Sequence, residues 1–121
     1  MAKSSQSKNN GNSWTQGLHA DDVREAFQEA TVDAYGDYEQ HTSLLTAIAD
    51  NLAFPYQAKV LGETVSVVGM KWPECDEFGL DLVCERNGEQ HRIEARSVEL
   101  QKPFPEGHLT LAAYLDWKSR F

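Results

Sequence analysis

Apolar residues between positions 20 and 52 recur at helical spacing in two successive groups. The first lies on one face of a helix predicted from Ala20 to Tyr35: Val23, Ala26, Phe27, Ala30 and Ala34. The second follows Asp37 and forms the apolar stripe of another helix: Leu44, Leu45, Ile48, Ala49 and Leu52. Gly36 is expected to end the first helix in a left-handed conformation, and Asp37 to form a capping box with Gln40. The pattern therefore predicts two short helices joined at Gly36.

After Pro55 the pattern changes to the alternation typical of strands. Val65 and Val67 alternate with polar residues, and a later strand has an apolar face of Phe78, Leu80, Leu82 and Cys84. Asn87-Gly88 predicts a two-residue hairpin turn that leads into a third strand from His91 to Ala95. Residues 56–60 and 98–100 are expected to add short strands, and spacing near the C-terminus predicts a closing helix: Leu109, Leu111, Ala112, Leu115 and Trp117.

These elements place the chain in the α+β class. We expect an N-terminal helix pair, a small bent antiparallel β-sheet of the SH3-like half-barrel kind, and a C-terminal helix. Residues 1–17 are polar and rich in Ser, Asn, Gly and Lys, which predicts a disordered tail in which only Trp14 could dock on a surface. The chain has 121 residues, 40% of them apolar, so residues 18–121 are expected to form a single domain.

The charge is unevenly distributed. The chain carries a net charge of -8, and residues 18–54 hold eight acids against one base, which is -7. This acidity argues against nucleic acid as a partner, because phosphate binding requires basic patches. No apolar run is long enough to span a membrane, and no apolar stretch near the N-terminus resembles a signal sequence. We therefore expect a cytoplasmic protein with no membrane partner.

Four carboxylates follow one edge of the first predicted helix. Asp22, Glu25, Glu29 and Asp33 are spaced by three, four and four residues, with only Arg24 nearby as a counter-charge. Like charges at these spacings each cost a few tenths of a kcal/mol, so the row is unfavourable by roughly 1 kcal/mol. A hard cation such as Ca²⁺, which takes oxygen ligands from carboxylates, carbonyls and water, would offset this repulsion.

The sharpest acidic group is Asp33, Asp37 and Glu39 around Gly36. The first predicted helix would end there with free carbonyls, whose partial negative charge favours a cation. The alternative left open is that Asp37 only caps its helix and the other two carboxylates are solvated. A weaker second group lies on the loop between strands, where Asp76 and Glu77 are the candidate ligands.

Sequence motifs for catalysis are absent. The chain has no phosphate-binding loop, dinucleotide glycine pattern, HExxH or nucleophile elbow, so we expect no enzyme. The histidines show no ligand spacing and are expected to be surface or packing residues: His19, His41, His91 and His108. Cys75 and Cys84 are expected to be free thiols, because their spacing matches no zinc motif.

Several segments together resemble a known family. They are DAYGDYEQ at 33–40, DNLAFPYQAKVLGETVSVVG at 50–69, the Asn87-Gly88 hairpin and the closing AAYLDWKSRF at 112–121. Over about residues 30–118 the chain resembles the small acidic calcium-binding proteins of the CcbP type, from cyanobacteria and other bacteria. The resemblance implies a cytoplasmic Ca²⁺ buffer or sensor, with Asp33, Asp37 and Glu39 on the acidic segment associated with the cation.

Two functions are thus predicted. The first is calcium binding by Asp33, Asp37 and Glu39, with Asp76 and Glu77 as a second group. The alternative is a metal-independent interaction module whose acidic face docks a basic protein partner.

Overall fold

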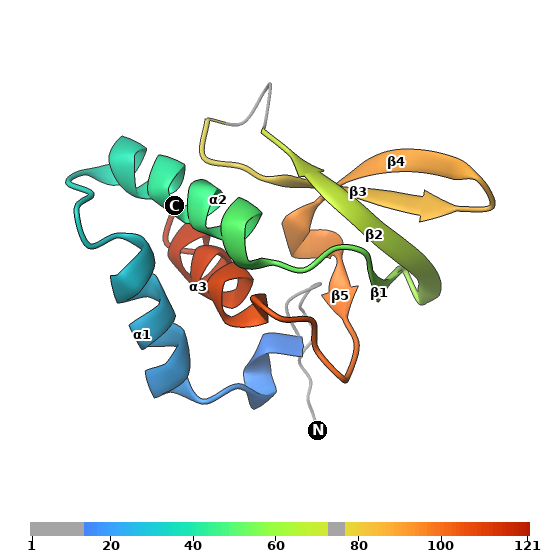
Figure 1. The fold of residues 1–121 in the computed structure, drawn as a ribbon, viewed down its shortest axis with the longest axis horizontal. Helices are drawn as coiled ribbons and strands as arrows, with labels where there is room; N and C mark the ends of the chain where they lie inside the picture. The colour runs from blue at the N-terminus through green and yellow to red at the C-terminus, as the bar shows by residue number, and fades with distance from the viewer. Residues whose placement is uncertain (1–13, 73–76) are drawn as a thin grey trace.

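The computed structural model describes residues 14–72 and 77–121, which form three helices beside one β-sheet (Figure 1). The helices gather on one side of the molecule and the strands extend from the other. None of the helices in this described part is long and apolar enough to cross a lipid bilayer. The predicted α+β class, with its helix pair and closing helix, is confirmed: α1 (Ala20–Ala30), α2 (Asp37–Asn51) and α3 (His108–Lys118).

The sheet has five antiparallel strands in the order β4-β3-β2-β1-β5. It is open and bent, and it does not close into a barrel. A register shift between Val67 and Gly69 puts a bulge into β2 opposite β3, and such bulges bend a strand. The strands are β1 (Tyr56–Val60), β2 (Glu63–Lys71), β3 (Asp81–Arg86), β4 (Glu89–Glu94) and β5 (Glu99–Leu100).

The hairpin predicted at Asn87-Gly88 joins β3 to β4. Asn87 has φ 56° and Gly88 has φ 81°, the positive values that a two-residue turn needs, and Arg86 pairs with Glu89 across it. A 3-10 turn (Ala95–Ser97) then carries the chain across the molecule to β5, which pairs with β1. Each of the five predicted strand regions contains a strand, but β3 begins at Asp81, after the predicted Phe78 and Leu80, and Ala95 lies in the 3-10 turn.

Helix α3 is the centre of the helical half. It packs against both α1 and α2, and it is buried on nearly every side, through Leu111, Ala112, Ala113, Tyr114, Leu115 and Trp117. Helix α2 adds its apolar stripe, whose Leu44, Leu45 and Ile48 are fully enclosed. Helix α1 has no fully buried residue and packs only its half-buried Val23 and Phe27 side against the core. The core therefore depends mainly on α2, α3 and the covered face of the sheet.

The chain is ordered before the predicted start of the domain. Residues 14–17 form a short 3-10 helix, and Trp14 is 7% exposed with its ring edge-on to Phe104 at 5.5 Å. Burial of so large a side chain compensates the entropy of ordering these residues. Residues 1–13, the rest of the predicted tail, lie outside the described residues.

The first helix ends earlier than its apolar spacing predicts. α1 stops at Ala30, and both the backbone N–H and the hydroxyl of Thr31 donate to the Phe27 carbonyl, at 3.0 and 2.8 Å. β-Branched Thr31 and Val32 favour helix less than their neighbours, and the Thr31 hydroxyl satisfies a carbonyl of the last turn. The predicted extension to Tyr35 is therefore wrong, and residues 31–36 form a connecting corner.

Gly107 should be the most sensitive glycine of the fold. It precedes α3 with φ 90°, and a Cβ there would lie 2.3 Å from the backbone oxygen of Asn51. Gly62 has a similar φ of 82° but open space around it, so it is a matched control. We expect Gly62→Ala to lower the free energy of unfolding by about 1 kcal/mol and Gly107→Ala by about 3 kcal/mol, since only the second adds a backbone clash. Urea unfolding measures both, and equal losses would contradict the close approach at Asn51.

Candidate cation-binding site

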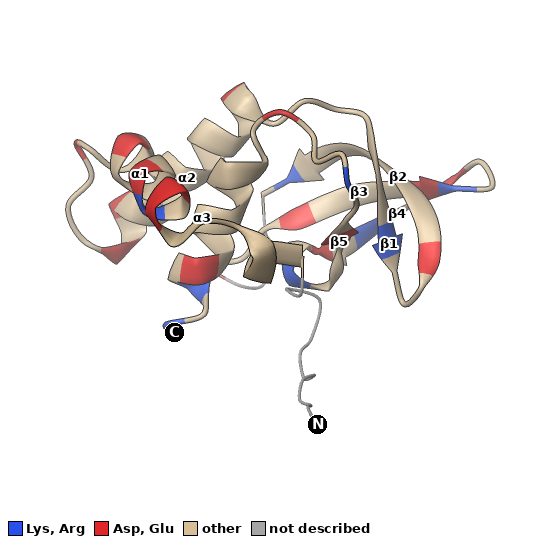
Figure 2. Ribbon diagram, turned by 90° about the horizontal axis from the view of Figure 1, so that it is seen from below, with Lys and Arg blue, Asp and Glu red and all other residues tan. Residues whose placement is uncertain are grey.

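Acidic and basic residues occupy different parts of the molecule (Figure 2). Asp and Glu are concentrated on α1 and at the start of α2, whereas most Lys and Arg lie over the strands. Several of the basic side chains already pair with neighbouring acids: Arg24 with Asp21, Arg86 with Glu63, Arg92 with Asp81, Arg96 with Glu94 and Arg120 with Asp116. The helical end therefore keeps an excess of carboxylates.

Asp33 and Asp37 lie at the corner between α1 and α2. Asp33 is in the turn that follows α1, and Asp37 is the first residue of α2. Both are exposed, and neither forms an ion pair or a side-chain hydrogen bond with any residue in the described ranges. An ion could bind these carboxylates without displacing an existing partner.

Glu39 forms a hydrogen bond that stabilises the same corner. Its carboxylate accepts a hydrogen bond from the backbone N–H of Tyr35 at 2.8 Å, one residue before the N-cap N–H that a capping box would use. The cap predicted for Asp37 and Gln40 is therefore wrong by one residue, because Gly36 is the N-cap and Glu39 is the third helical residue. One Glu39 oxygen holds the corner, and the other remains for a ligand.

Gly36 lies at the N-terminal end of α2, whereas the sequence predicted the C-terminal end of the first helix there. α1 ends six residues earlier, and the Gly36 carbonyl accepts from the Gln40 N–H at 3.0 Å, the first bond of α2. Gly36 has φ 87° and ψ 163°, which is not the left-handed helical conformation expected of a C-cap. The predicted supply of free carbonyls at Gly36 is wrong. The end of α2 at this point carries partial positive charge, so an ion there must be held by side chains.

A buried histidine joins this corner to the sheet. His41 is 3% exposed, and its Nε2 lies 2.9 Å from the Gly79 carbonyl oxygen, so Nε2–H donates to that oxygen. Four aromatic rings surround the imidazole, with centroids between 5.7 and 6.4 Å away: Trp72, Phe78, Tyr114 and Trp117. We call His41, its bond to Gly79 and these four rings the His41 clamp.

Two further hydrogen bonds fasten the clamp. The Tyr114 hydroxyl donates to the Phe78 carbonyl at 2.8 Å, and the Trp117 indole N–H donates to the Gln40 side-chain oxygen at 3.0 Å. Together with the bond from His41, they tie residues 77–80 to both α2 and α3. The Gln40 side chain therefore accepts a hydrogen bond from α3 and does not cap α2.

The clamp brings the second predicted acidic group toward the first. Asp37 is one helical turn before His41, and His41 contacts Gly79, two residues after Glu77. Glu77 is exposed at the start of this fastened segment, while Asp76 lies outside the described residues. Within the ranges 14–72 and 77–121, no three His, Cys, Asp or Glu side chains are grouped closely enough to hold a metal ion. The described carboxylates of the two predicted groups therefore do not form a preformed cage.

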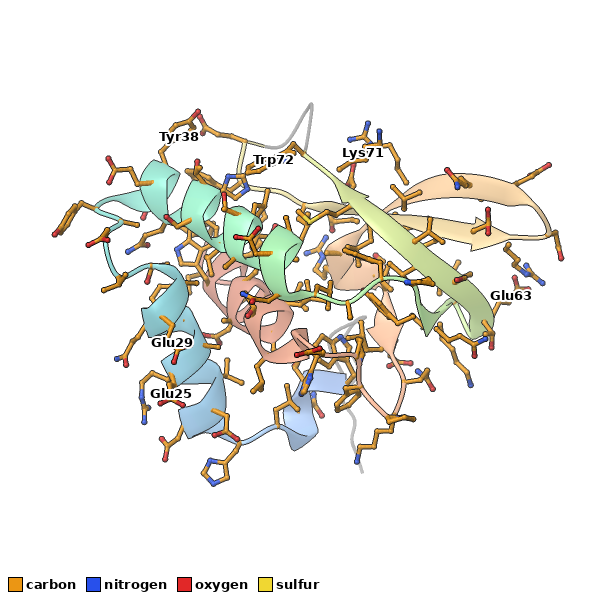
Figure 3. The ribbon with its side chains drawn as sticks, in the orientation of Figure 1. Glu25, Glu29, Tyr38, Glu63, Lys71 and Trp72 are labelled. Atoms are coloured by element: carbon orange, nitrogen blue, oxygen red, sulfur yellow. The ribbon has the colours of Figure 1, made fainter. Side chains whose placement is uncertain are left out.

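The remaining members of the predicted acidic row lie elsewhere. Asp22, Glu25 and Glu29 line an open groove of about 440 Å³ between α1 and the segment before α3, together with Glu106. Figure 3 shows Glu25 and Glu29 on α1, well separated from Tyr38 at the start of α2. Because α1 ends at Ala30, Asp33 does not continue this row as predicted.

Cys84 is unsuited to bind a metal. It is a free thiol, as expected, and is 3% exposed beneath the sheet, where burial raises its pKa. Only the thiolate is a good metal ligand, so this protonated side chain acts as a small core residue. Cys75 lies outside the described residues.

The signal for His41 was present in the sequence but ambiguous. His41, Leu44, Leu45 and Ile48 follow the spacing of one buried helix face, which fits the expected packing role. Which carbonyl the ring would meet depends on a segment 38 residues away, and local spacing cannot show that. Trp72 is 49% exposed at the edge of the clamp.

These features define a class of small α+β proteins in which three helices stand beside an open, bent, five-stranded sheet. Among solved structures, the chain is similar to the crystal structure of CcbP from Anabaena. The two share 20% sequence identity with a TM-score of 0.66, over 85% of this chain and 94% of the other. The chain therefore has a CcbP-like fold. No model of a protein family matches the chain, and no curated protein matches it.

Removing the His41 side chain should destabilise the protein strongly. His41→Ala leaves the buried Gly79 carbonyl without its donor and empties the centre of four rings, so we expect a loss of about 3 kcal/mol in the free energy of unfolding. Thr42→Ala is the control, because Thr42 is the exposed neighbour and should change stability by less than about 0.5 kcal/mol. Urea unfolding followed by tryptophan fluorescence compares them. Similar losses for the two variants would mean that the clamp does not hold the segment.

Proposed function

We propose that this protein binds Ca²⁺ between the acidic junction of α1 and α2 and the segment that begins at Glu77. Asp33 and Asp37 supply carboxylates from the corner, and Glu77 supplies one from the facing segment. Glu39 adds its second oxygen, and Asp76, which lies outside the described residues, remains a ligand proposed from the sequence alone. The observation that supports the proposal is the His41 clamp. His41 is one helical turn after Asp37, and it is hydrogen-bonded to Gly79, two residues after Glu77.

The ligand chemistry supports calcium over other metals. Ca²⁺ takes six to eight oxygen ligands in flexible geometry, and it accepts a site built from exposed carboxylates and water. Mg²⁺ requires a stricter octahedron and releases its water reluctantly, while soft metals need thiolates or imidazoles. His41 is committed to Gly79, and Cys84 is buried as a thiol.

Electrostatics supply the driving force. Residues 18–54 carry a net charge of -7, and the free carboxylates of the corner repel each other. A divalent cation removes this repulsion and draws the corner and the facing segment closer, which completes a coordination shell that the ion-free protein does not preform. Such a site suits a Ca²⁺ buffer or sensor, as the resemblance to CcbP-type proteins implies.

Two paired substitutions test the proposal. Isothermal titration of the metal-free protein with Ca²⁺ should give a binding isotherm, and Ca²⁺ should raise the melting temperature because it binds only the folded state. Asp33→Asn combined with Asp37→Asn should weaken binding by at least about tenfold, a loss of about 1.4 kcal/mol. Glu25→Gln combined with Glu29→Gln removes the same charge from α1 and should leave the affinity within about twofold, since surface charges beyond a Debye length are screened.

The Ca²⁺ titration of the unmodified protein can by itself overturn the proposal. If millimolar Ca²⁺ produced no heat and no rise in melting temperature, the protein would not be a calcium binder. If the two double variants weakened binding equally, the carboxylates of the α1 groove would have to be assigned to the ion's site.

A further inference from the structure

The corner between α1 and α2 exposes an unusual amount of apolar surface. Across the described residues, six large apolar side chains are exposed: Val32, Tyr35, Tyr38, Leu61, Trp72 and Phe121. Val32, Tyr35 and Tyr38 belong to one seven-residue stretch and are 73%, 78% and 68% exposed. We call these three the aromatic corner. Clustering of exposed aromatic residues marks interaction sites more often than scattered single residues do.

The backbone holds these side chains outward. The Thr31 N–H and hydroxyl both bond to the Phe27 carbonyl, the Ala34 N–H bonds to the Thr31 carbonyl at 3.0 Å, and the Tyr35 N–H bonds to Glu39. Each turn of the corner therefore has its own hydrogen bond. Rigid aromatic side chains on a fixed backbone lose little entropy when a partner binds, which favours affinity.

The exposed aromatic surface continues along α2. Tyr38 is three residues before His41, and the Trp72 ring lies 6.3 Å from the His41 ring, so Tyr38 and Trp72 flank the same side of the helix (Figure 3). Trp72 keeps 49% of its surface exposed. A partner at the aromatic corner could extend over this indole.

Charge at the corner selects the kind of partner. Asp33 and Asp37 alternate with the aromatic residues and have no ion-pair partner among the described residues. An arginine or lysine side chain matches both features, because its cation pairs with the carboxylate while its stem or guanidinium plane packs on the tyrosine ring. Nucleic acids and anionic membrane surfaces carry phosphates, which this acidic corner repels.

We propose that the aromatic corner, with Asp33 and Asp37, docks an arginine- or lysine-rich segment of another polypeptide. This interaction is additional to calcium binding and does not depend on it. The tyrosine rings supply the specific contacts, and the carboxylates supply the long-range attraction.

A peptide titration in EDTA tests this proposal without calcium. The probe is a short fluorescein-labelled peptide of alternating arginine and glycine, followed by fluorescence anisotropy at near-physiological salt, with the glutamate version of the peptide as the negative control. We expect saturable binding of the arginine peptide only. Tyr35→Ala combined with Tyr38→Ala leaves the charge unchanged and should weaken binding by at least about tenfold, as expected for two lost cation–π contacts.

The control variant is again Glu25→Gln with Glu29→Gln, which lowers the acidity of α1 and leaves the aromatic corner intact. Its affinity should stay within about twofold of the unmodified protein. Both double variants change exposed residues, and unchanged melting temperatures would confirm that they fold. The proposal is overturned if the unmodified protein does not bind the arginine peptide, or if the tyrosine variant binds it as well as the control variant does. Because all samples contain EDTA, neither result depends on whether the protein binds Ca²⁺.

Discussion

The hydrogen bond from the His41 ring to the Gly79 carbonyl is the constraint that joins α2 to the segment before β3. The bond is buried among four aromatic rings, where water cannot replace either partner, so breaking it leaves a polar group unsatisfied. Through it, the start of α2 and the segment before β3 become one unit with α3. Without it, the segment that carries Glu77 would lose its bond to α2 and keep only the bond from Tyr114 of α3 to the Phe78 carbonyl.

Charge and exposed apolar side chains occur together in the stretch from Val32 to Glu39, next to His41 in the sequence. The corner presents carboxylates that lack cationic partners within the described structure, and it places Tyr35 and Tyr38 among them. The two proposed ligands use these features differently. A calcium ion needs only the oxygens, whereas a basic peptide needs both the oxygens and the rings. Since both would use Asp33 and Asp37, occupation of the corner by one should weaken the other, through charge neutralisation and direct competition.

Much of the architecture follows from local patterns in the sequence. The apolar stripe of α2, the alternation in β2 and the Asn87-Gly88 turn each determine their element through short-range chemistry, and the structure bears them out. The end of α1 was missed because the apolar spacing continues to Ala34, while the hydrogen bonds of Thr31 and the β-branched pair Thr31-Val32 stop the helix first. Because the first helix was expected to reach Tyr35, Gly36 was expected at its C-terminal end, but Gly36 precedes the N-terminal end of α2.

The candidate site was predictable only in part. The acidic residues are visible in the sequence, but their grouping depends on contacts between distant segments, such as His41 with Gly79. Spacing alone joined Asp33 to Glu25 and Glu29, whereas α1 ends at Ala30 and Asp33 lies in the turn beyond it.

The central claim is that the clamp brings two acidic segments together to bind one ion, and chemical-shift mapping tests this most directly. A calcium titration of the ¹⁵N-labelled, metal-free protein should shift the amide signals of residues 33–41 and 77–80 together, with one common affinity. Shifts confined to α1 around Glu25 and Glu29, or no shifts at millimolar Ca²⁺, would contradict the account.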